Sequence, residues 1–468
     1  MRKMEGVMNG QYASFLAAKT PKAVRRGLKA MPTIGSHLFP FQRASVEFAL
    51  DVGPAGMFLD TGLGKTVVQL EYLEHARTAT NGRALLLTPL AVARQIEREG
   101  NKFGYPVGVV RDQSEVGEGI NICNYDRLHL LNPEEFGAVS LDEGSILKSF
   151  TGKTTRSLID AFSGCRFKMA ATATPAPNDH MEIGQYAEFC EVMQSNEMLS
   201  RFFINDTANA SQSWRLKRHG VESFWDWMAS WSRMAQVPSD LGGSDDGFVL
   251  QPIHVHRHLA AESAPTVTGG LFGDIVVSAT NQHQIKRATA ENRARLAADL
   301  VISGDDPWVL WCDTDYEADA IMTALDGVAG VVEVRGSMPA DRKESNLEAF
   351  ADGSARIMVT KPSVAGFGLN WQHCAHTVFV GRSFSYESWY QAVRRFWRFG
   401  QKREVQVHLI VAEGEDSIAR VIDRKADDHA SMKAAMRAAM IRNAGRSSAV
   451  RVGYEPNHKG RIPSWLSA

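Results

Sequence analysis

The sequence predicts an α/β protein with two parallel-sheet lobes in tandem and a helical insertion between them. Short apolar runs alternate with helix-patterned stretches from about residue 38 to 185, and the same alternation begins again near residue 290. Between the two, residues 186–250 are helical in pattern and rich in aromatic side chains. Such alternation is typical of parallel sheets with helices on both faces. A chain of 468 residues is long enough for two or three domains with separate cores.

The apolar runs are the expected strands. They lie at residues 56–59, 83–88, 120–123, 137–141 and 167–172 in the first lobe, and at residues 307–312, 330–335, 355–360, 376–381 and 405–411 in the second. Helical patterns at residues 66–76 and 90–101 separate the first of them. We therefore divide the chain into an N-terminal arm (1–36), a first lobe (37–185), a helical insertion and linker (186–285), a second lobe (286–441) and a basic C-terminal tail (442–468).

The composition excludes several classes of protein. The net charge is −1 and the pI about 6.9, so nucleic acid would have to bind in a local groove of Lys and Arg. No apolar run approaches the roughly 20 residues of a membrane span, and the N-terminus lacks a hydrophobic signal core. The five cysteines are scattered without a CxxC pair, which favours a reducing compartment over a disulfide framework or a zinc site. We expect a cytoplasmic protein that does not bind membranes.

A glycine-rich loop follows the first expected strand. The segment DTGLGKT, residues 60–66, stands between a strand and a helix. Gly62 and Gly64 allow backbone N–H groups to turn inward around a phosphate at the start of that helix. Lys65 would reach the β- and γ-phosphates of ATP, and the Thr66 hydroxyl would ligate Mg²⁺. This loop predicts nucleotide binding.

Two adjacent acids stand at the end of another expected strand, in VSLDEGS at residues 139–145. Asp142 would hold Mg²⁺, directly or through water, and Glu143 would polarise the water that attacks the phosphate. An acidic pair at a strand end is usually only a solvated turn. Here the pair lies on the same expected sheet as the glycine-rich loop, which favours the catalytic interpretation.

An arginine-rich segment, QAVRRFWRFGQ at residues 391–401, follows the fourth expected strand of the second lobe. If it is helical, Gln391, Arg395 and Arg398 share one face, because their spacings are four and three. Arg395 and Arg398 would then reach across a cleft as arginine fingers, which raise turnover by about 10³–10⁵. A basic surface stripe or a nucleic-acid contact is the alternative, and we assign Arg394 to that class.

Taken in order, these segments resemble the motif series of the superfamily 2 helicases. The series comprises FPFQ (39–42), DTGLGKT (60–66), LLLTPLAV (85–92), NYDRL (124–128), LDEGS (141–145), TATPAPND (172–179), SVAGFGLN (363–370) and QAVRRFWRFGQ (391–401). Several of these motifs are weak alone, but their joint order is specific. The QAxxRxxRxGQ form of the last motif is that of Swi/Snf-like translocases. The resemblance covers about residues 1–430 and is greatest to the compact members encoded by bacteriophages and prophages.

The resemblance implies two RecA-like lobes that bind ATP and Mg²⁺ between them. Gln42 corresponds to the glutamine that reads adenine, with Phe39 or Arg43 beside it to stack on the base. Gly368 corresponds to a loop that touches both nucleotide and nucleic acid, and Gln391 joins the nucleotide-binding set.

The resemblance also implies contacts to the nucleic-acid backbone. These would come from Thr88 and Pro89 in the first lobe, and from Arg335 and Ser337 of the segment RGSM in the second.

Residue 59 is Leu where the strict phosphate-loop pattern has Gly, but superfamily 2 motors commonly relax that position. Two other positions depart from the family pattern. Ser145 stands where many relatives have His. Residue 394 is Arg where chromatin remodellers usually carry an acid. None of these departures abolishes the ATP chemistry, but the details of coupling do not transfer.

By this resemblance the chain is a monomeric motor that hydrolyses ATP while it moves along double-stranded DNA. Two alternatives stay open. One is a strand-separating helicase on DNA or RNA, for which the insertion could hide a wedge hairpin. The other is a poorly hydrolysing scaffold that ATP switches on DNA, although the joint presence of Glu143, Arg395 and Arg398 argues against it.

Two further features are expected to be structural. Phe224 and Trp231 are seven residues apart, which predicts a buried helix face rather than a base-stacking surface. The segment HVHRH at residues 254–258 places three histidines on one face of an expected strand. Because no Cys or carboxylate pair lies nearby, we do not expect a metal site there.

Overall fold

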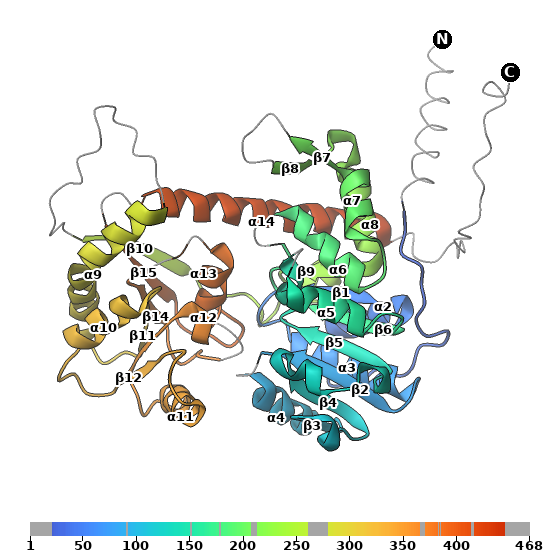
Figure 1. Ribbon diagram of the computed structural model, residues 1–468, viewed down its shortest axis with the longest axis horizontal. Helices are drawn as coiled ribbons and strands as arrows, with labels where there is room; N and C mark the ends of the chain where they lie inside the picture. Colours follow the sequence, from blue (N-terminus) through green and yellow to red (C-terminus); the bar gives the residue numbers. More distant parts are fainter. Residues whose placement is uncertain are drawn as a thin grey trace, which may run out of the picture.

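The computed structural model describes residues 21–89, 92–149, 152–176, 179–206, 213–260, 279–365, 370–381, 383, 385–412 and 416–444. Within these ranges the chain forms two parallel sheets and one antiparallel pair of strands (Figure 1). Helices cover both faces of each parallel sheet. The predicted class, two parallel-sheet lobes in tandem, is confirmed.

The first lobe is built on a seven-stranded sheet of order β3-β4-β2-β5-β6-β1-β9, in which neighbours are parallel. Its strands are β1 (Ala55–Leu59), β2 (Arg83–Thr88), β3 (Val107–Val109), β4 (Gly119–Asn124), β5 (Ala138–Asp142), β6 (Phe167–Ala171) and β9 (Ser232–Ala235). Its helices are α2 (Pro40–Val52), α3 (Lys65–Thr78), α4 (Ala93–Phe103), α5 (Lys153–Ala161), α6 (Ile183–Phe189), α7 (Ser195–Phe202) and α8 (Val221–Trp231). Strands covered on both faces are mostly apolar, and β1 and β6 are buried at every residue, Lys168 of β6 included.

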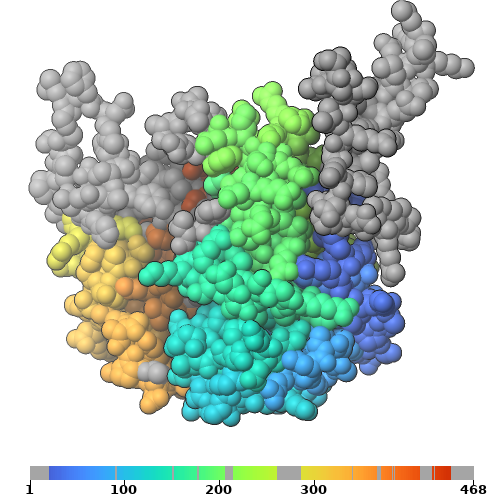
Figure 2. Space-filling model, turned by 45° about the vertical axis from the view of Figure 1, so that its right-hand side comes forward, coloured from blue at the N-terminus to red at the C-terminus, as the bar shows by residue number. Residues whose placement is uncertain are grey.

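The second lobe is built on a six-stranded parallel sheet of order β10-β15-β14-β11-β13-β12. Its strands are β10 (Ile253–Ala260), β11 (Trp308–Trp311), β12 (Val331–Val334), β13 (Ile357–Thr360), β14 (His376–Phe379) and β15 (Val405–Ala412). Its helices are α9 (Ala279–Ile302), α10 (Asp315–Ala324), α11 (Ala340–Ala351), α12 (Pro362–Ala365) and α13 (Tyr386–Val393). In the space-filling view this lobe, yellow to orange, lies against the first, blue to cyan (Figure 2).

The segment expected to be a helical insertion supplies strands to both sheets. β9 pairs with β1 at the edge of the first sheet, and β10 pairs with β15 at the edge of the second. The chain therefore passes between the sheets within residues 236–252. The same segment contains an antiparallel pair, β7 (Phe203–Asp206) with β8 (Ser213–Leu216), which was not predicted.

The aromatic group of this segment is packed into the first lobe. Phe224, Trp227 and Trp231 on α8 have exposed fractions of 0%. The rings of Phe202 and Trp227 stack with 5.4 Å between their centroids, and Trp231 meets Phe58 of β1 edge to face. The structure therefore agrees with the packing interpretation of this group.

The last described helix, α14 (Asp416–Ala444), follows β15 of the second lobe but packs on the first. In Figure 1 it runs across the molecule toward α8. Its residues Met432, Met436, Ala439 and Met440 are buried in the hydrophobic core of the first lobe. We expected residues 286–441 to belong to the second lobe, and this part of α14 does not. No helix in the described ranges, α14 included, has the length and hydrophobicity to cross a membrane.

Histidines lie side by side on β10, β15 and β14. His258 and His408 share a hydrogen bond of 2.9 Å, and the rings of His256 and His408 stack at 4.7 Å. Burial, together with the nearby His256, His258 and His376, lowers the pKa of His408 to about 4. Among the described residues, no group of three or more His, Cys, Asp or Glu is arranged to hold a metal ion.

We expect this cluster to destabilise the protein as the pH falls from about 6.5 toward 4. His408 stays neutral in the folded protein over this window but takes up a proton in the unfolded chain, so acid favours unfolding. Because the side chain is partly exposed, its contribution is on the order of 1 kcal/mol near pH 5. The free energy of unfolding, measured with urea near pH 7.5 and near pH 5, should decrease less between these pH values for His408→Gln than for the unmodified protein. Equal losses in the two proteins would contradict this expectation.

Candidate active site

The predicted residues of the first lobe gather at one edge of its sheet. Strands β2, β5, β6 and β1 are neighbours and run parallel, so their carboxyl ends stand side by side. The glycine-rich loop leaves β1 and the acidic pair ends β5. The carboxyl edge of a parallel sheet, where loops from adjacent strands meet, is the usual place for a ligand site in such folds.

The glycine-rich loop requires glycine at two positions. Gly62 and Gly64 have φ angles of 95° and 75°, in the left-handed region that favours glycine. A Cβ at residue 62 would lie 3.0 Å from the backbone nitrogen of Phe399, in the second lobe. A Cβ at residue 64 would lie 2.3 Å from Nε2 of Gln42. The loop is therefore shaped by its own backbone and by close neighbours from both lobes.

Lys65 begins α3 and turns back over this loop. Its Nζ donates to the carbonyl of Leu59 at 3.0 Å. Burial lowers the pKa of Lys65, although the carboxylates of Glu143, Asp60 and Asp142 favour the charged form. The ammonium group is thus poorly hydrated and close to acids, and an added polyphosphate would be a strong partner for it.

Gln42 connects α2 to the glycine-rich loop. Its Nε2 donates to the carbonyl of Leu63 at 3.0 Å, and its Oε1 accepts from the backbone of Phe39 at 3.0 Å. Phe39 is 48% exposed beside it. The sequence did not indicate that Phe248, from the linker, stands between Phe39 and Phe399 of the second lobe, with centroid distances of 5.2 and 4.8 Å. These rings could form an aromatic wall beside Gln42.

Asp142 is fixed by side chains from two neighbouring elements. Its Oδ1 accepts from Gln69 and its Oδ2 from the hydroxyl of Thr88, both at 3.0 Å. Thr88 has an exposed fraction of 0%, so its side chain cannot reach a nucleic-acid backbone. The Thr88 hydroxyl therefore orients Asp142, and a nucleic-acid contact of Thr88 would have to come from its backbone.

Glu143 turns toward the second lobe. Its φ of 56° is unusual for a residue other than glycine and directs the side chain out of the strand. Its Oε1 accepts from the hydroxyl of Thr172 at 2.8 Å and from Nε2 of Gln391, in the second lobe, at 3.4 Å. Burial raises the pKa of Glu143, and the nearby Asp142 adds to the rise while Lys65 opposes it. A carboxylate with a raised pKa is a stronger base.

The arginine-rich segment is only partly helical. Helix α13 ends at Val393, and the residues after it form turns. The expected single helical face of Gln391, Arg395 and Arg398 is therefore wrong, since regular helix stops between the first and second of them. Phe396, with an exposed fraction of 0%, is buried in the core of the second lobe, which accounts for the change of direction.

Both arginines nevertheless approach the acids of the first lobe. Nε of Arg395 donates to the carbonyl of Gln391 at 3.2 Å, and Glu143 lies near enough to favour its charge. Burial and Arg398 lower the pKa of Arg395 to about 9, and burial and Arg394 lower that of Arg398 to about 10. Arg398 donates through Nη1 to Asn370, while its Nε is buried with no hydrogen-bond partner in the described part of the chain. An anion between the lobes could accept from the Nε of Arg398 and would be attracted by both charges.

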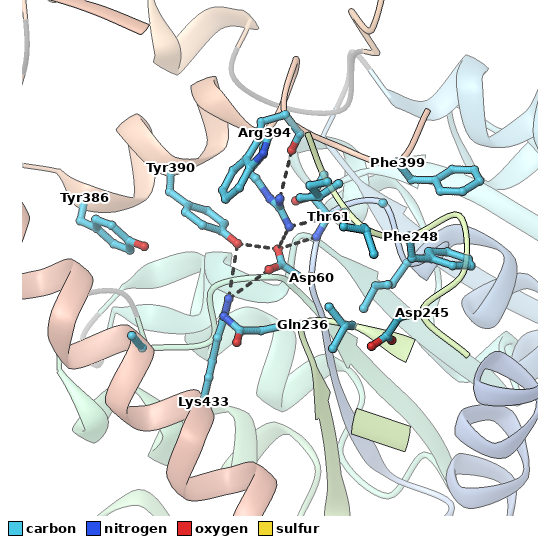
Figure 3. A pocket seen from close by; sticks show the side chains of 17 residues that line it. Asp60, Thr61, Gln236, Asp245, Phe248, Tyr386, Tyr390, Arg394, Phe399 and Lys433 are labelled. Carbon is cyan, nitrogen blue, oxygen red and sulfur yellow. Dashed lines mark hydrogen bonds and ion pairs between the residues drawn. The ribbon is translucent and has the colours of Figure 1, made fainter. Parts of the chain in front are cut away.

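Arg394 does not lie on a surface. It is 3% exposed and forms an ion pair of 2.7 Å with Asp60, in the first lobe. Lys433 of α14 approaches the same carboxylate at 3.2 Å, and the hydroxyl of Tyr390 donates to it (Figure 3). The predicted nucleic-acid contact by Arg394 is therefore corrected, because burial and the ion pair remove it from solvent. Nothing in the sequence pattern indicated Asp60, Tyr390 or Lys433.

A cavity of about 380 Å³ lies beside this ion cluster, between the lobes (Figure 3). It is lined by the start of the glycine-rich loop, the linker around Phe248, the segment from Tyr386 to Phe399, and Lys433 of α14. Arg395, Arg398 and Glu143 do not line it. The two predicted arginine fingers and the acidic pair therefore lie outside the lining of this cavity.

The remaining predicted contacts are dispersed. Pro89 is half-buried at the end of β2, and Ser337 is exposed after β12. Arg335 is engaged by Asp319 at 2.7 Å and by Glu333. Gly368 lies outside the described residues. The structure thus brings the predicted ATP residues together, whereas the nucleic-acid contacts of Pro89, Arg335 and Ser337 stay predictions.

The donor set at this edge fits a nucleotide with Mg²⁺. The Asp142 carboxylate and the Thr66 hydroxyl offer the oxygen ligands that Mg²⁺ prefers. Backbone turned by Gly62 and Gly64 can receive phosphate oxygens at the N-terminus of α3. The buried hydroxyl of Thr174 has no hydrogen-bond partner among the described residues, which leaves it available to a ligand. The arrangement can bind a nucleoside triphosphate and direct water at its last phosphate.

Comparison with known proteins supports this assignment. Residues 295–400 match the family model of the helicase conserved C-terminal domain. Protein p41 of Acyrthosiphon pisum secondary endosymbiont phage 1 is 23% identical over 440 residues, covering 82% of this chain and 94% of that protein. DEAD-box ATP-dependent RNA helicase 21 of Oryza sativa subsp. japonica is 26% identical over 136 residues, covering 29% of this chain and 18% of that protein.

Two solved structures were compared with the fold of this chain. The S. cerevisiae Dbp5 structure, bound to RNA and ADP BeF3, superposes with a TM-score of 0.54 at 12% identity, covering 86% of this chain and 94% of that chain. The Sulfolobus solfataricus SWI2/SNF2 ATPase core in complex with dsDNA gives a TM-score of 0.40 at 15% identity, covering 91% and 100%. The first of these superpositions shows that the two sheets are tandem RecA-like lobes.

Proposed function

Because the chain is a nucleic-acid-dependent ATPase of helicase superfamily 2, with a phage-encoded relative, we propose that it hydrolyses ATP between its lobes while tracking along double-stranded DNA. The observation that carries the proposal is the meeting of Glu143 with Gln391 across the lobes, at 3.4 Å. The acid that would activate water and the arginine segment of the second lobe thereby share one site. A single chain supplies both halves, so the motor acts as a monomer.

The first lobe holds the nucleotide in this proposal. Lys65 and the loop glycines Gly62 and Gly64 bind the phosphates, while Gln42 reads the base against Phe39. Thr66 and Asp142 hold Mg²⁺, which when bound offsets charge on the β- and γ-phosphates. The hydrogen bonds from Gln69 and Thr88 to Asp142 support this role, since they fix the carboxylate before any ligand arrives.

Hydrolysis uses residues of both lobes. Glu143 orients the attacking water and accepts its proton, and its raised pKa suits it to that task. Arg395 and Arg398 stabilise the charge that develops on the transferred phosphoryl group. Because these arginines belong to the second lobe, ATP binding draws the lobes together and product release relaxes them. Alternation between these two states moves the lobes along the nucleic-acid backbone.

Duplex DNA is the proposed track because residues 391–401 have the QAxxRxxRxGQ form of Swi/Snf-like translocases. Contacts to the backbone carry little sequence preference and weaken steeply with salt. Pro89, Arg335 and Ser337 are the candidates for such contacts. The match to a phage protein over 82% of this chain supports action in the cytoplasm of an infected bacterial cell.

Strand separation is the second candidate, favoured by two observations. The antiparallel pair of β7 and β8 provides a hairpin of the kind that could divide two strands. The 136-residue match to a DEAD-box RNA helicase keeps RNA within the possible substrates. A triplex-displacement assay beside a fork-unwinding assay distinguishes the two candidates, because a pure translocase displaces the third strand and leaves the fork intact.

We expect ATP hydrolysis to be stimulated most by duplex DNA when no polymer, single-stranded DNA, duplex DNA and RNA are compared. Steady-state release of phosphate measures this directly. The concentration of DNA needed for half-maximal stimulation should rise steeply with salt, since the contacts are to phosphates. Lys65→Ala, assayed with each polymer, reports any contaminating ATPase. Stimulation by RNA alone would overturn the duplex-DNA proposal while leaving the ATPase intact.

A further inference from the structure

The carboxylate of Asp60 joins three segments of the molecule (Figure 3). Asp60 follows β1 at the start of the glycine-rich loop and is 5% exposed. Its Oδ1 pairs with Arg394 of the second lobe at 2.7 Å, and its Oδ2 with Lys433 of α14 at 3.2 Å. Burial alone would raise the pKa of Asp60, but the two cations hold it well below its usual range. The carboxylate is therefore ionised and engaged from both sides.

Arg394 binds two segments at once. Its Nη1 donates to the carbonyl of Trp397 at 3.0 Å, within its own turn, and its guanidinium lies 5.0 Å from the centroid of the Trp397 ring. Its Nη2 reaches the carboxylate of Asp60 and the carbonyl of Thr61, the latter at 3.3 Å. Since α13 has already ended, these contacts fasten the turn of residues 394–398 to the glycine-rich loop.

The two proposed arginine fingers lie on this fastened turn. Arg395 is the next residue after Arg394; it contacts Gln391, and Glu143 lies near enough to favour its charge. Arg398 directly follows Trp397, whose carbonyl Arg394 holds. Groups that act on a reacting phosphate must be held to within about 0.5 Å, usually by a supporting layer of residues. Asp60 and Arg394 form such a layer, through the ion pair between them and the hydrogen bond from Arg394 to Trp397.

We propose that Asp60 and Arg394 are positioning residues, which set Arg395 and Arg398 for hydrolysis without touching the nucleotide. This inference rests on the proposed function, in which those two arginines act on the γ-phosphate. Position 394 is Arg here, where chromatin remodellers usually carry an acid. The acid that pairs with Arg394 is Asp60, on the glycine-rich loop. The ion pair connects the second lobe to the loop that would hold the phosphates. It thereby fixes the position of Arg395 and Arg398 relative to that loop.

Lys433 offers a matched control in the same cluster. It contacts the Asp60 carboxylate and, at 3.4 Å, the hydroxyl of Tyr390, but no residue of the turn at 394–398. Lys433→Met removes one cation from the carboxylate and keeps the Arg394 pair. If the turn is what matters, this variant keeps its turnover, whereas Asp60→Asn does not.

Steady-state kinetics test the inference. We expect Asp60→Asn to lower kcat about ten-fold while KM for ATP changes by no more than about two-fold. The same substitution in an Arg395→Ala background should cost less than about two-fold, because residues that act through one another are not additive. Arg394→Lys keeps the charge, but a lysine cannot contact Asp60 and the Trp397 carbonyl at the same time. The kcat of this variant should lie between that of Asp60→Asn and that of the unmodified protein. Equal costs in the two backgrounds, or an equal loss in Lys433→Met, would overturn the inference.

Hydrogen exchange gives a second measurement that does not depend on turnover. In Asp60→Asn, amides of residues 394–398 should exchange faster, while β1 and β5 keep their protection and Lys433→Met resembles the unmodified protein. Unchanged exchange in this turn would refute the fastening even if kcat fell. If the unmodified protein hydrolyses no ATP with any polymer, the proposed function fails, and the exchange result still decides whether Asp60 holds the turn.

Discussion

Replacement of Glu143 by Gln is expected to lower kcat by about 10²–10⁴, the usual contribution of a general base, while ATP binding is retained. Gln keeps the size of the side chain and can still meet the hydroxyl of Thr172. It cannot take a proton from water. Lys65 and the loop glycines are untouched, so the phosphates keep their partners. The substitution therefore separates binding from hydrolysis.

A fluorescent ATP analogue and single-turnover phosphate release measure the two steps of this prediction separately. Glu135→Gln is a matched control, since it makes the same chemical change on an acid that pairs with Arg83 at 2.6 Å near the start of β2, far from the loops. It should hydrolyse ATP normally. Lys65→Ala should lose binding and turnover together. Normal turnover in Glu143→Gln would refute its role as the base.

Replacement of Arg398 by Ala is expected to lower kcat by about 10³–10⁵, with little change in nucleotide affinity. Its Nε is buried without a hydrogen-bond partner in the described part of the chain, so a phosphoryl group would be its natural acceptor. A group that binds mainly the transition state affects kcat and leaves ground-state binding nearly unchanged. Because burial already lowers the pKa of Arg398 to about 10, its removal also relieves a desolvated charge, and folding should not suffer.

Single-turnover hydrolysis beside equilibrium binding tests this prediction, with Arg403→Ala as its control. Arg403 is also in the second lobe and close in sequence, but pairs with Asp306 at 2.7 Å on the surface. Its removal should leave kcat unchanged. A kcat for Arg398→Ala within about three-fold of normal would show that Arg398 does not act on the phosphate.

The sequence was most informative where local pattern and tertiary role coincide. Buried parallel strands consist mainly of apolar residues, so β1, β2 and β6 could be located within a residue or two. The glycines of the phosphate loop need left-handed backbone, which few other residues adopt. Lys65 and the acidic pair directly follow expected strands, so their place at the carboxyl edge of the first sheet could also be predicted from local pattern.

Features set by distant packing could not be predicted. Strand β9 has only four residues, Ser232–Ala235, and becomes a strand because it pairs with β1. The end of α13 depends on Phe396, which is drawn into the core of the second lobe. The role of Lys433 depends on where α14 docks, and a lysine in a helix has no sequence signal for a buried ion pair.

The route of the chain gives the two lobes two separate connections. The first runs through residues 236–252, between β9 and β10, and the second is α14, which leaves β15 and buries its methionines in the core of the first lobe. A body joined to another at one point can swing in any direction, whereas one joined at two points turns chiefly about the line between them. The second lobe is therefore expected to rotate chiefly about one axis relative to the first lobe, rather than in all directions. Under the proposed function, each ATP cycle would repeat the same rotation, and the motor would advance by a constant distance.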